Sequence, residues 1–168
     1  FFVVWDIIFT ERGVWGFNPD YLTGINIINL PIEEVLFFIC IPYACVFTYF
    51  ALNHLVRNKA LEKYDFSLKI LFSLIALCFI VFGIGLDYPF YTGCFTTLFM
   101  AIMIYRKTPM NYAFLTYFII IPFFLLSNGF LTGSFTDAPV VWYNDGENFG
   151  KRIFTIPVED ALYGFLMI

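Results

Sequence analysis

Four apolar stretches, each long enough to cross a lipid bilayer, limit what this chain can fold into. A helix needs about 17–25 residues to cross a hydrocarbon core that is ~30 Å thick. The stretches that meet this length are residues 31–56, 67–86, 88–105 and 111–131. Each is joined to the next by a short polar linker, so the sequence predicts a membrane protein.

The two ends of the chain are apolar as well. We expect residues 1–9 and 157–168 to be pieces of two further spans that are cut by the chain ends, which gives six spanning segments in all. Only 13% of the residues are charged, against about 25% in soluble domains. The predicted fold class is therefore all-α, a polytopic transmembrane helical bundle.

Charge excludes one class of function. The net charge is −4, and the Lys and Arg residues form no basic cluster. A nucleic-acid-binding protein needs a basic surface to neutralise phosphates, so we expect no nucleic-acid partner. We also expect no metal site.

An acidic pair stands at the head of one apolar stretch, in the sequence Pro31-Ile32-Glu33-Glu34. Helix starts favour this pattern in any case, because proline needs no donor there and carboxylates interact well with the positive end of the helix dipole. A second interpretation is chemical, because ionisable residues inside a membrane are costly and are usually functional.

An internal repeat favours the chemical interpretation. Shifted by 126 residues, positions 9–38 align without a gap on positions 135–164, and nine of the thirty pairs are identical. The repeat places a second motif, Pro-Val-Glu-Asp, at residues 157–160. Because an even number of predicted spans separates the two motifs, we expect parallel repeats with both motifs on one membrane face. The predicted halves are residues 1–66 and 67–168, truncated at the N- and C-terminus respectively.

Adjacent helical residues point about 100° apart, so one acid of each pair can face the bundle interior. We expect this to be the position that is identical in both copies, Glu33 and Glu159. Glu34 and Asp160 are then expected to act as partners or caps. A carboxyl that faces apolar surroundings favours its protonated form, so it can serve as a general acid.

The stretch "WDIIFTERGVWGFNPDYLTG", followed by "LPIEEVLFFICIPYACVFTY" and by "PVED" one repeat later, resembles the lycopene cyclase domain of the non-flavin, heterodimer-type or fused membrane cyclases. This resemblance implies carotenoid biosynthesis and a lycopene β-cyclase, an isomerase of the intramolecular-lyase type that closes the ψ ends of lycopene to β-ionone rings. It maps Glu33, Glu34, Glu159 and Asp160 onto the acidic motifs of the family. It also implies a lycopene substrate taken from the lipid phase and a location in a bacterial cell membrane, and it leaves open an association with other carotenoid enzymes.

Cyclisation needs an acid, a base and walls that tolerate a cation, but no hydride. The sequence contains no Gly-rich dinucleotide fingerprint, so we expect no cofactor. Aromatic faces attract cations. The candidate substrate-binding residues are Phe37, Phe38, Tyr43 and Tyr163, for which packing or lipid contact is the alternative, with Asp6 as a further candidate.

A proton-coupled transporter or channel subunit would also use repeats and intramembrane carboxylates. Such proteins usually build their ion sites from helices broken by Gly and Pro near the bilayer midplane, whereas here the acids stand at helix ends. Which end groups of lycopene are cyclised, and whether the repeats form one site or two, stay open at this point.

Overall fold

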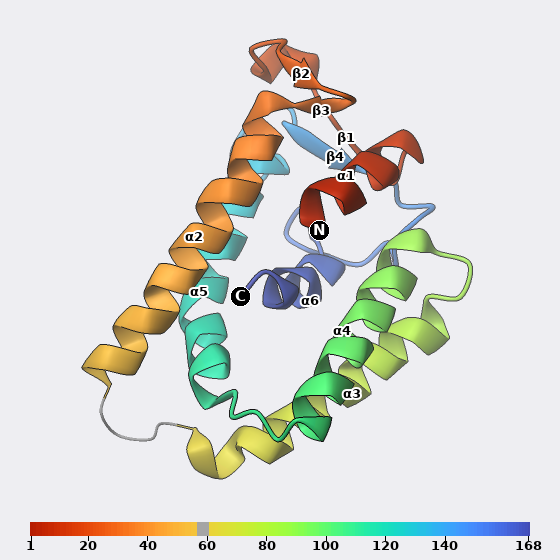
Figure 1. Ribbon diagram of the computed structural model, residues 1–168. Coiled ribbons are helices and arrows are strands. Elements are labelled where there is room, and N and C mark those ends of the chain that lie inside the picture. The colour runs from red at the N-terminus through yellow and green to blue at the C-terminus, as the bar shows by residue number, and fades with distance from the viewer. Residues whose placement is uncertain (57–60) are drawn as a thin grey trace.

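The computed structural model describes residues 1–56 and 61–168 as a bundle of helices with short strand pairs at one end (Figure 1). Its helices are α1 (Phe2–Glu11), α2 (Ile32–Leu55), α3 (Asp65–Phe82), α4 (Asp87–Tyr105), α5 (Asn111–Leu131) and α6 (Glu159–Leu166), with 3-10 turns η1 (Pro19–Tyr21) and η2 (Glu62–Tyr64). Its strands are β1 (Trp15–Phe17), β2 (Asn26–Ile27), β3 (Leu30–Pro31), β4 (Val141–Tyr143), β5 (Arg152–Ile153) and β6 (Ile156–Pro157). The expected helical class is confirmed.

Three of the six expected spans meet the length and hydropathy of a membrane-crossing helix. Within the described residues, three helical segments are long and apolar enough to cross a membrane: Ile32–Leu55, Glu62–Phe82 and Asn111–Leu131. Helix α4 has 19 residues, but its threonines and its N-terminal Asp87 make it less apolar than these. Helices α1 and α6, with 10 and 8 residues, lie at the two ends of the chain, where pieces of spans are expected.

The long helices form two pairs. Helix α2 lies beside α5, and α3 lies beside α4, with the short helix α6 between the two pairs (Figure 1). One buried apolar cluster joins α3, α4, α5 and α6 through Phe72, Met100, Phe114 and Phe165. A second cluster, rich in aromatic rings, packs around α1 and includes Trp5, Phe9, Trp15, Tyr88 and Tyr163. Helix α6 therefore contributes side chains to both clusters.

The loop before α2 and the loop before α6 have the same local structure, 126 residues apart. In the first, β2 pairs with β3, and Ile32 N donates to Ile25 O over 2.8 Å. In the second, β5 pairs with β6 in the same register, and Val158 N donates to Lys151 O over 3.1 Å. The turn residues Ile28 and Phe154 both have a left-handed backbone, with φ of 61° and 56°.

Strands β1 and β4 pair with each other, although the sequences that form them align one repeat apart. The antiparallel register is centred on Gly16 opposite Trp142. Beyond the strands, Asn18 N donates to Val140 O over 2.8 Å, and Asn144 N donates to Val14 O over 2.9 Å. Asn18 and Asn144 are equivalent positions of the repeat, and so are Val14 and Val140. The two bonds are therefore equivalent to each other. The β1–β4 pair thus joins the loop region that follows α1 to the loop region that follows α5.

Close packing of α3 against α4 depends on Gly93. A Cβ atom at this position would lie 2.7 Å from the Ala76 backbone oxygen and 3.0 Å from the Ile80 nitrogen. Both are backbone atoms of α3, so the clash with a Cβ atom can be relieved only if the whole helix moves.

We expect Gly93→Ala to lower the free energy of unfolding by about 1–3 kcal/mol, because overpacking outweighs the gain in helix propensity. Gly129→Ala, inside α5, is the matched control, since its Cβ would meet only the side chains of Ser134 and Phe135, at 3.5 Å or more. Thermal denaturation of the detergent-solubilised protein measures both. Equal stability of the two variants would contradict the role given to Gly93.

Candidate active site

A narrow cavity lies where α1, α2, α4, α5, α6 and the β1–β4 pair meet. Its free volume is about 50 Å³, little more than one or two water molecules occupy. Three carboxyl groups line it, together with aromatic rings and a few polar side chains. The lining residues are Asp6, Trp15, Phe17, Glu34, Phe37, Phe38, Tyr88, Phe124, Asn128, Leu131, Thr132, Val141, Tyr143, Asp160, Tyr163 and Met167.

Asp160, in the first turn of α6, is 1% exposed and is held by three donors. Tyr88 Oη donates to Oδ1 over 2.6 Å. On Oδ2, Asn128 Nδ2 donates over 2.7 Å and Tyr143 Oη over 3.0 Å. These donors come from α4, α5 and β4, so one carboxyl connects three elements to α6.

Tyr143 is suited to this donor role. Burial raises the pKa of its phenol well above the ordinary value, and the neighbouring Asp160 carboxyl adds to the effect. The hydroxyl therefore stays protonated and can donate a hydrogen bond to the carboxyl oxygen of Asp160.

Asp6, on α1, is also 1% exposed. The indole Nε1 of Trp15 donates to its Oδ1, while Oδ2 has no partner among the described residues. Asp6, named from the sequence as a further candidate, therefore lies in the cavity wall.

Glu34 lines the same cavity from the first turn of α2. In residues 1–56 and 61–168, its carboxyl group has no hydrogen-bond partner. Glu34 and Asp160 occupy equivalent positions of the two repeats, so the structure brings together one acid from each motif, along with Asp6.

Glu33 and Glu159, the two acids expected to face the interior, do not line this cavity, although Glu159 is fully buried. Glu33 Oε1 accepts the backbone N–H of Thr23 over 2.8 Å, and Glu159 Oε1 accepts that of Phe149 over 2.7 Å. Each thus holds the loop ten residues before it, and neither lines the cavity. The rotation of about 100° per helical residue explains the exchange of roles, because each inward acid is the next residue along the helix.

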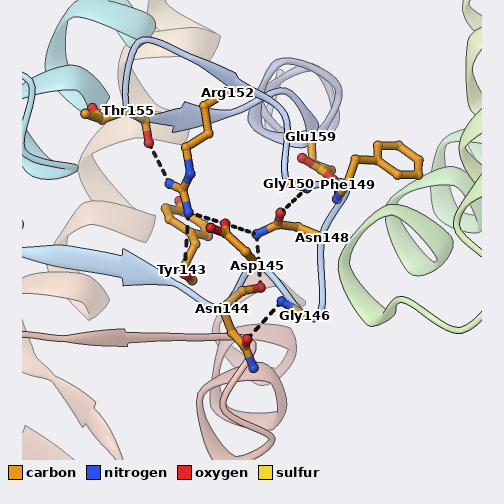
Figure 2. A network of polar contacts seen from close by, with 10 residues as sticks. All are labelled: Tyr143, Asn144, Asp145, Gly146, Asn148, Phe149, Gly150, Arg152, Thr155 and Glu159. Atoms are coloured by element: carbon orange, nitrogen blue, oxygen red, sulfur yellow. Dashed lines mark hydrogen bonds and ion pairs between the residues drawn. The ribbon is translucent and has the colours of Figure 1, made fainter.

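A polar network supports the second of these loops (Figure 2). Arg152 forms an ion pair with Asp145, and its Nη1 donates to Thr155 O over 2.7 Å. Arg152 lowers the pKa of the Asp145 carboxyl. Asn148 Nδ2 donates to Asn144 O over 3.0 Å, and Asn148 Oδ1 accepts the N–H of Gly150 over 2.7 Å. The network fixes the segment between β4 and the start of α6, from which Glu159 binds Phe149.

Of the four aromatic residues expected to bind substrate, three line the cavity and one does not. Phe37, Phe38 and Tyr163 line the cavity, whereas Tyr43, two turns further along α2, is 72% exposed and lies outside it. The buried hydroxyl of Tyr163 has no partner among the described residues. The exposure of Tyr43 fits the alternative of lipid contact that the sequence analysis kept for it.

Sequence reasoning missed the donors around Asp160. Asn128 had a usable signal, since it is an amide near the end of a mostly apolar stretch. Tyr88 and Tyr143 had none, because this chain contains 11 tyrosines and nothing local distinguishes these two. Among the described residues, no group of acidic, His and Cys side chains is arranged to hold a metal ion.

Apolar spans, a bundle of helices and a buried cavity with three carboxyls define a helical membrane protein with a site suited to proton transfer. The family model described as lycopene cyclase matches residues 1–52 and 87–168. The chain belongs to the lycopene cyclase family.

One curated relative is the bifunctional lycopene cyclase/phytoene synthase of Aspergillus niger. It is 38% identical over 45 residues, which cover 27% of this chain and 8% of that protein's length. No solved structure matches the chain.

The loop-holding role of Glu159 leads to a prediction. Glu159→Ala leaves the partly buried N–H of Phe149 without its acceptor, and we expect it to lower the free energy of unfolding by about 1–3 kcal/mol. Glu159→Gln keeps an acceptor oxygen and is expected to lose less. Thermal denaturation in detergent compares the two, and an equal loss from both would contradict this role.

Proposed function

We propose that this chain is a lycopene cyclase domain, an isomerase of the intramolecular-lyase type that closes ψ end groups of lycopene to β-ionone rings. One observation supports this most: Glu34 and Asp160, one from each acidic motif, line one aromatic cavity in a chain of this family. The substrate is expected to enter from the lipid phase of a bacterial cell membrane.

The reaction is balanced without a cofactor. An acid adds a proton to the terminal C=C bond of the ψ end, which leaves a tertiary cation. The neighbouring C=C bond closes the ring and moves the cation to a ring carbon. A base then removes one proton, so the formula does not change and no electrons are exchanged. The reaction thus requires two proton-transfer groups on one cavity.

The walls of the cavity suit such a cation. The rings of Trp15, Tyr88 and Tyr163 lie around the carboxyl groups, with centroids 5.1 Å apart for Trp15 and Tyr88 and 6.0 Å apart for Tyr88 and Tyr163. Aromatic faces attract positive charge, most strongly where water is excluded. A dry wall also protects the cation from addition of water.

The cavity must widen to accept an end group, because small-molecule sites are usually about 300–1,000 Å³ and the free volume is about 50 Å³. Phe37 and Phe38 are only partly buried where α2 borders the cavity. Movement of these two side chains is therefore the simplest way to admit the end of a polyene.

We also propose that the bundle consists of two parallel repeats related by a pseudo-twofold axis that passes through the β1–β4 pair. The reciprocal bonds of Asn18 and Asn144 support this, as does the matching register of the β2–β3 and β5–β6 pairs. In this arrangement the two motifs contribute to one composite site.

The test of this function exchanges carboxyl for amide at nearly constant shape. In lycopene-producing cells that express the full-length protein, Glu34→Gln and Asp160→Asn are expected to lower cyclisation by roughly 10²–10⁴-fold, because a proton-transfer group is lost. Pigment extraction and chromatography measure lycopene against cyclised products.

Glu33→Gln is the matched control, since it neutralises the adjacent acid but leaves the cavity unchanged. We expect this variant to keep most of its activity. Normal cyclisation by both Glu34→Gln and Asp160→Asn would overturn the assignment of the acids. No cyclisation by the wild-type protein would overturn the function itself and favour the proton-coupled transporter.

A further inference from the structure

The three carboxyls of the cavity differ in their hydrogen-bond partners. Asp160 accepts from three donors, Asp6 from one, and Glu34 from none within the described residues. Donors aimed at a carboxyl stabilise its charged form and restrict its orientation. A carboxyl without donors is free to rotate and to hold a proton.

We propose that the three donors around Asp160 are positioning residues that aim it as the base of the cyclisation, and that their geometry determines which ring isomer forms. Glu34 is then the proton donor. This inference rests on the proposed cyclase function and gives separate roles to two acids that sequence symmetry makes equivalent.

Ring closure leaves a cation that can lose a proton from any of three neighbouring carbons. Loss from the newly bonded ring carbon gives a β ring, loss from the ring methylene gives an ε ring, and loss from the methyl group gives a γ ring. The three protons lie close together, so a base must be held in one place to choose among them. Mispositioning of about 1 Å is enough to alter a catalysed step strongly.

The donors are arranged to restrain Asp160 in this way. Tyr88 holds Oδ1 from α4, while Asn128 and Tyr143 hold Oδ2 from α5 and β4. Because the bonds reach both oxygens and come from different elements, neither rotation nor translation of the carboxyl is free. After each turnover the proton returns from Asp160 to Glu34 across the cavity. Both carboxyl groups are then in the protonation states in which they began.

The repeat explains why only one half has this restraint. The position equivalent to Tyr143 in the first repeat is Phe17, which has no group to donate. The equivalent of Asp160 is Glu34, which has one more methylene and no donors. The two halves have thus diverged at the side chains that surround each acid.

The experiment compares Tyr88→Phe, Tyr143→Phe and Asn128→Leu in the full-length protein, expressed in lycopene-producing cells. Each removes one donor and keeps most of the shape. We expect turnover to fall roughly 10-fold or more, as for loss of one hydrogen bond to a charged group, and the share of minor ring isomers to rise. Chromatography and NMR of the extracted pigments measure the isomers, and immunoblotting measures the amount of protein in the membrane.

Tyr117→Phe is the matched control. Tyr117 Oη donates to the backbone oxygen of Ala161 over 2.9 Å, so this variant also removes a tyrosine hydroxyl bound to α6 but leaves Asp160 intact. We expect its isomer ratio to equal that of the wild type. Loss of stability without mispositioning would lower the amount of protein and leave the ratio unchanged.

Wild-type isomer ratios in all three variants would overturn the inference, whatever their rates. So would a shifted ratio in the Tyr117→Phe control, or complete loss of product from all three at normal protein levels, because mispositioning leaves a working acid and base. Failure of the wild-type protein to cyclise would instead contradict the proposed function, so the two results are distinguishable.

Discussion

A carboxyl group removed from water must find hydrogen-bond donors or give up its charge, and much of this structure follows from that requirement at Asp160. Its donors Tyr88, Asn128 and Tyr143 lie on α4, α5 and β4, so these elements must meet the start of α6 with hydrogen-bond accuracy. The aromatic cluster around Trp15 and Tyr163 packs beside this junction and excludes solvent. Helix α6 is short, and the bonds at its first turn fix it between the two helix pairs (Figure 1).

Burial at this junction does two things at once. It makes the polar network costly to break, because each donor that loses its acceptor stays in a dry environment. It also creates the conditions under which proton transfer to a hydrocarbon is feasible, since a carbocation in water would be captured at once. The same exclusion of solvent therefore stabilises the fold and protects the chemistry that we propose.

Hydropathy and the repeat predicted the helical class and the two acidic motifs from sequence, because both signals are periodic and local. They could not predict which acid of each pair lines the cavity. Identity between the copies pointed to Glu33 and Glu159, but these residues repeat because each holds the same loop, through Thr23 N and Phe149 N. A shared structural role preserved the identical residues, while the cavity acids Glu34 and Asp160 differ in length. The donors of Asp160 lie up to 72 residues away in the chain, beyond what local patterns can show.

The β1–β4 pair has a consequence for how such a chain can be divided. Each loop region supplies one strand, and each strand has the other as its partner. A half of the molecule made alone would present an unpaired edge of backbone donors and acceptors. It would also contain an incomplete cavity, with Asp6 and Glu34 in residues 1–66 and Asp160 with its three donors in residues 67–168. The same ladder that leaves each loop region incomplete by itself also gives it a specific means of recognising the other.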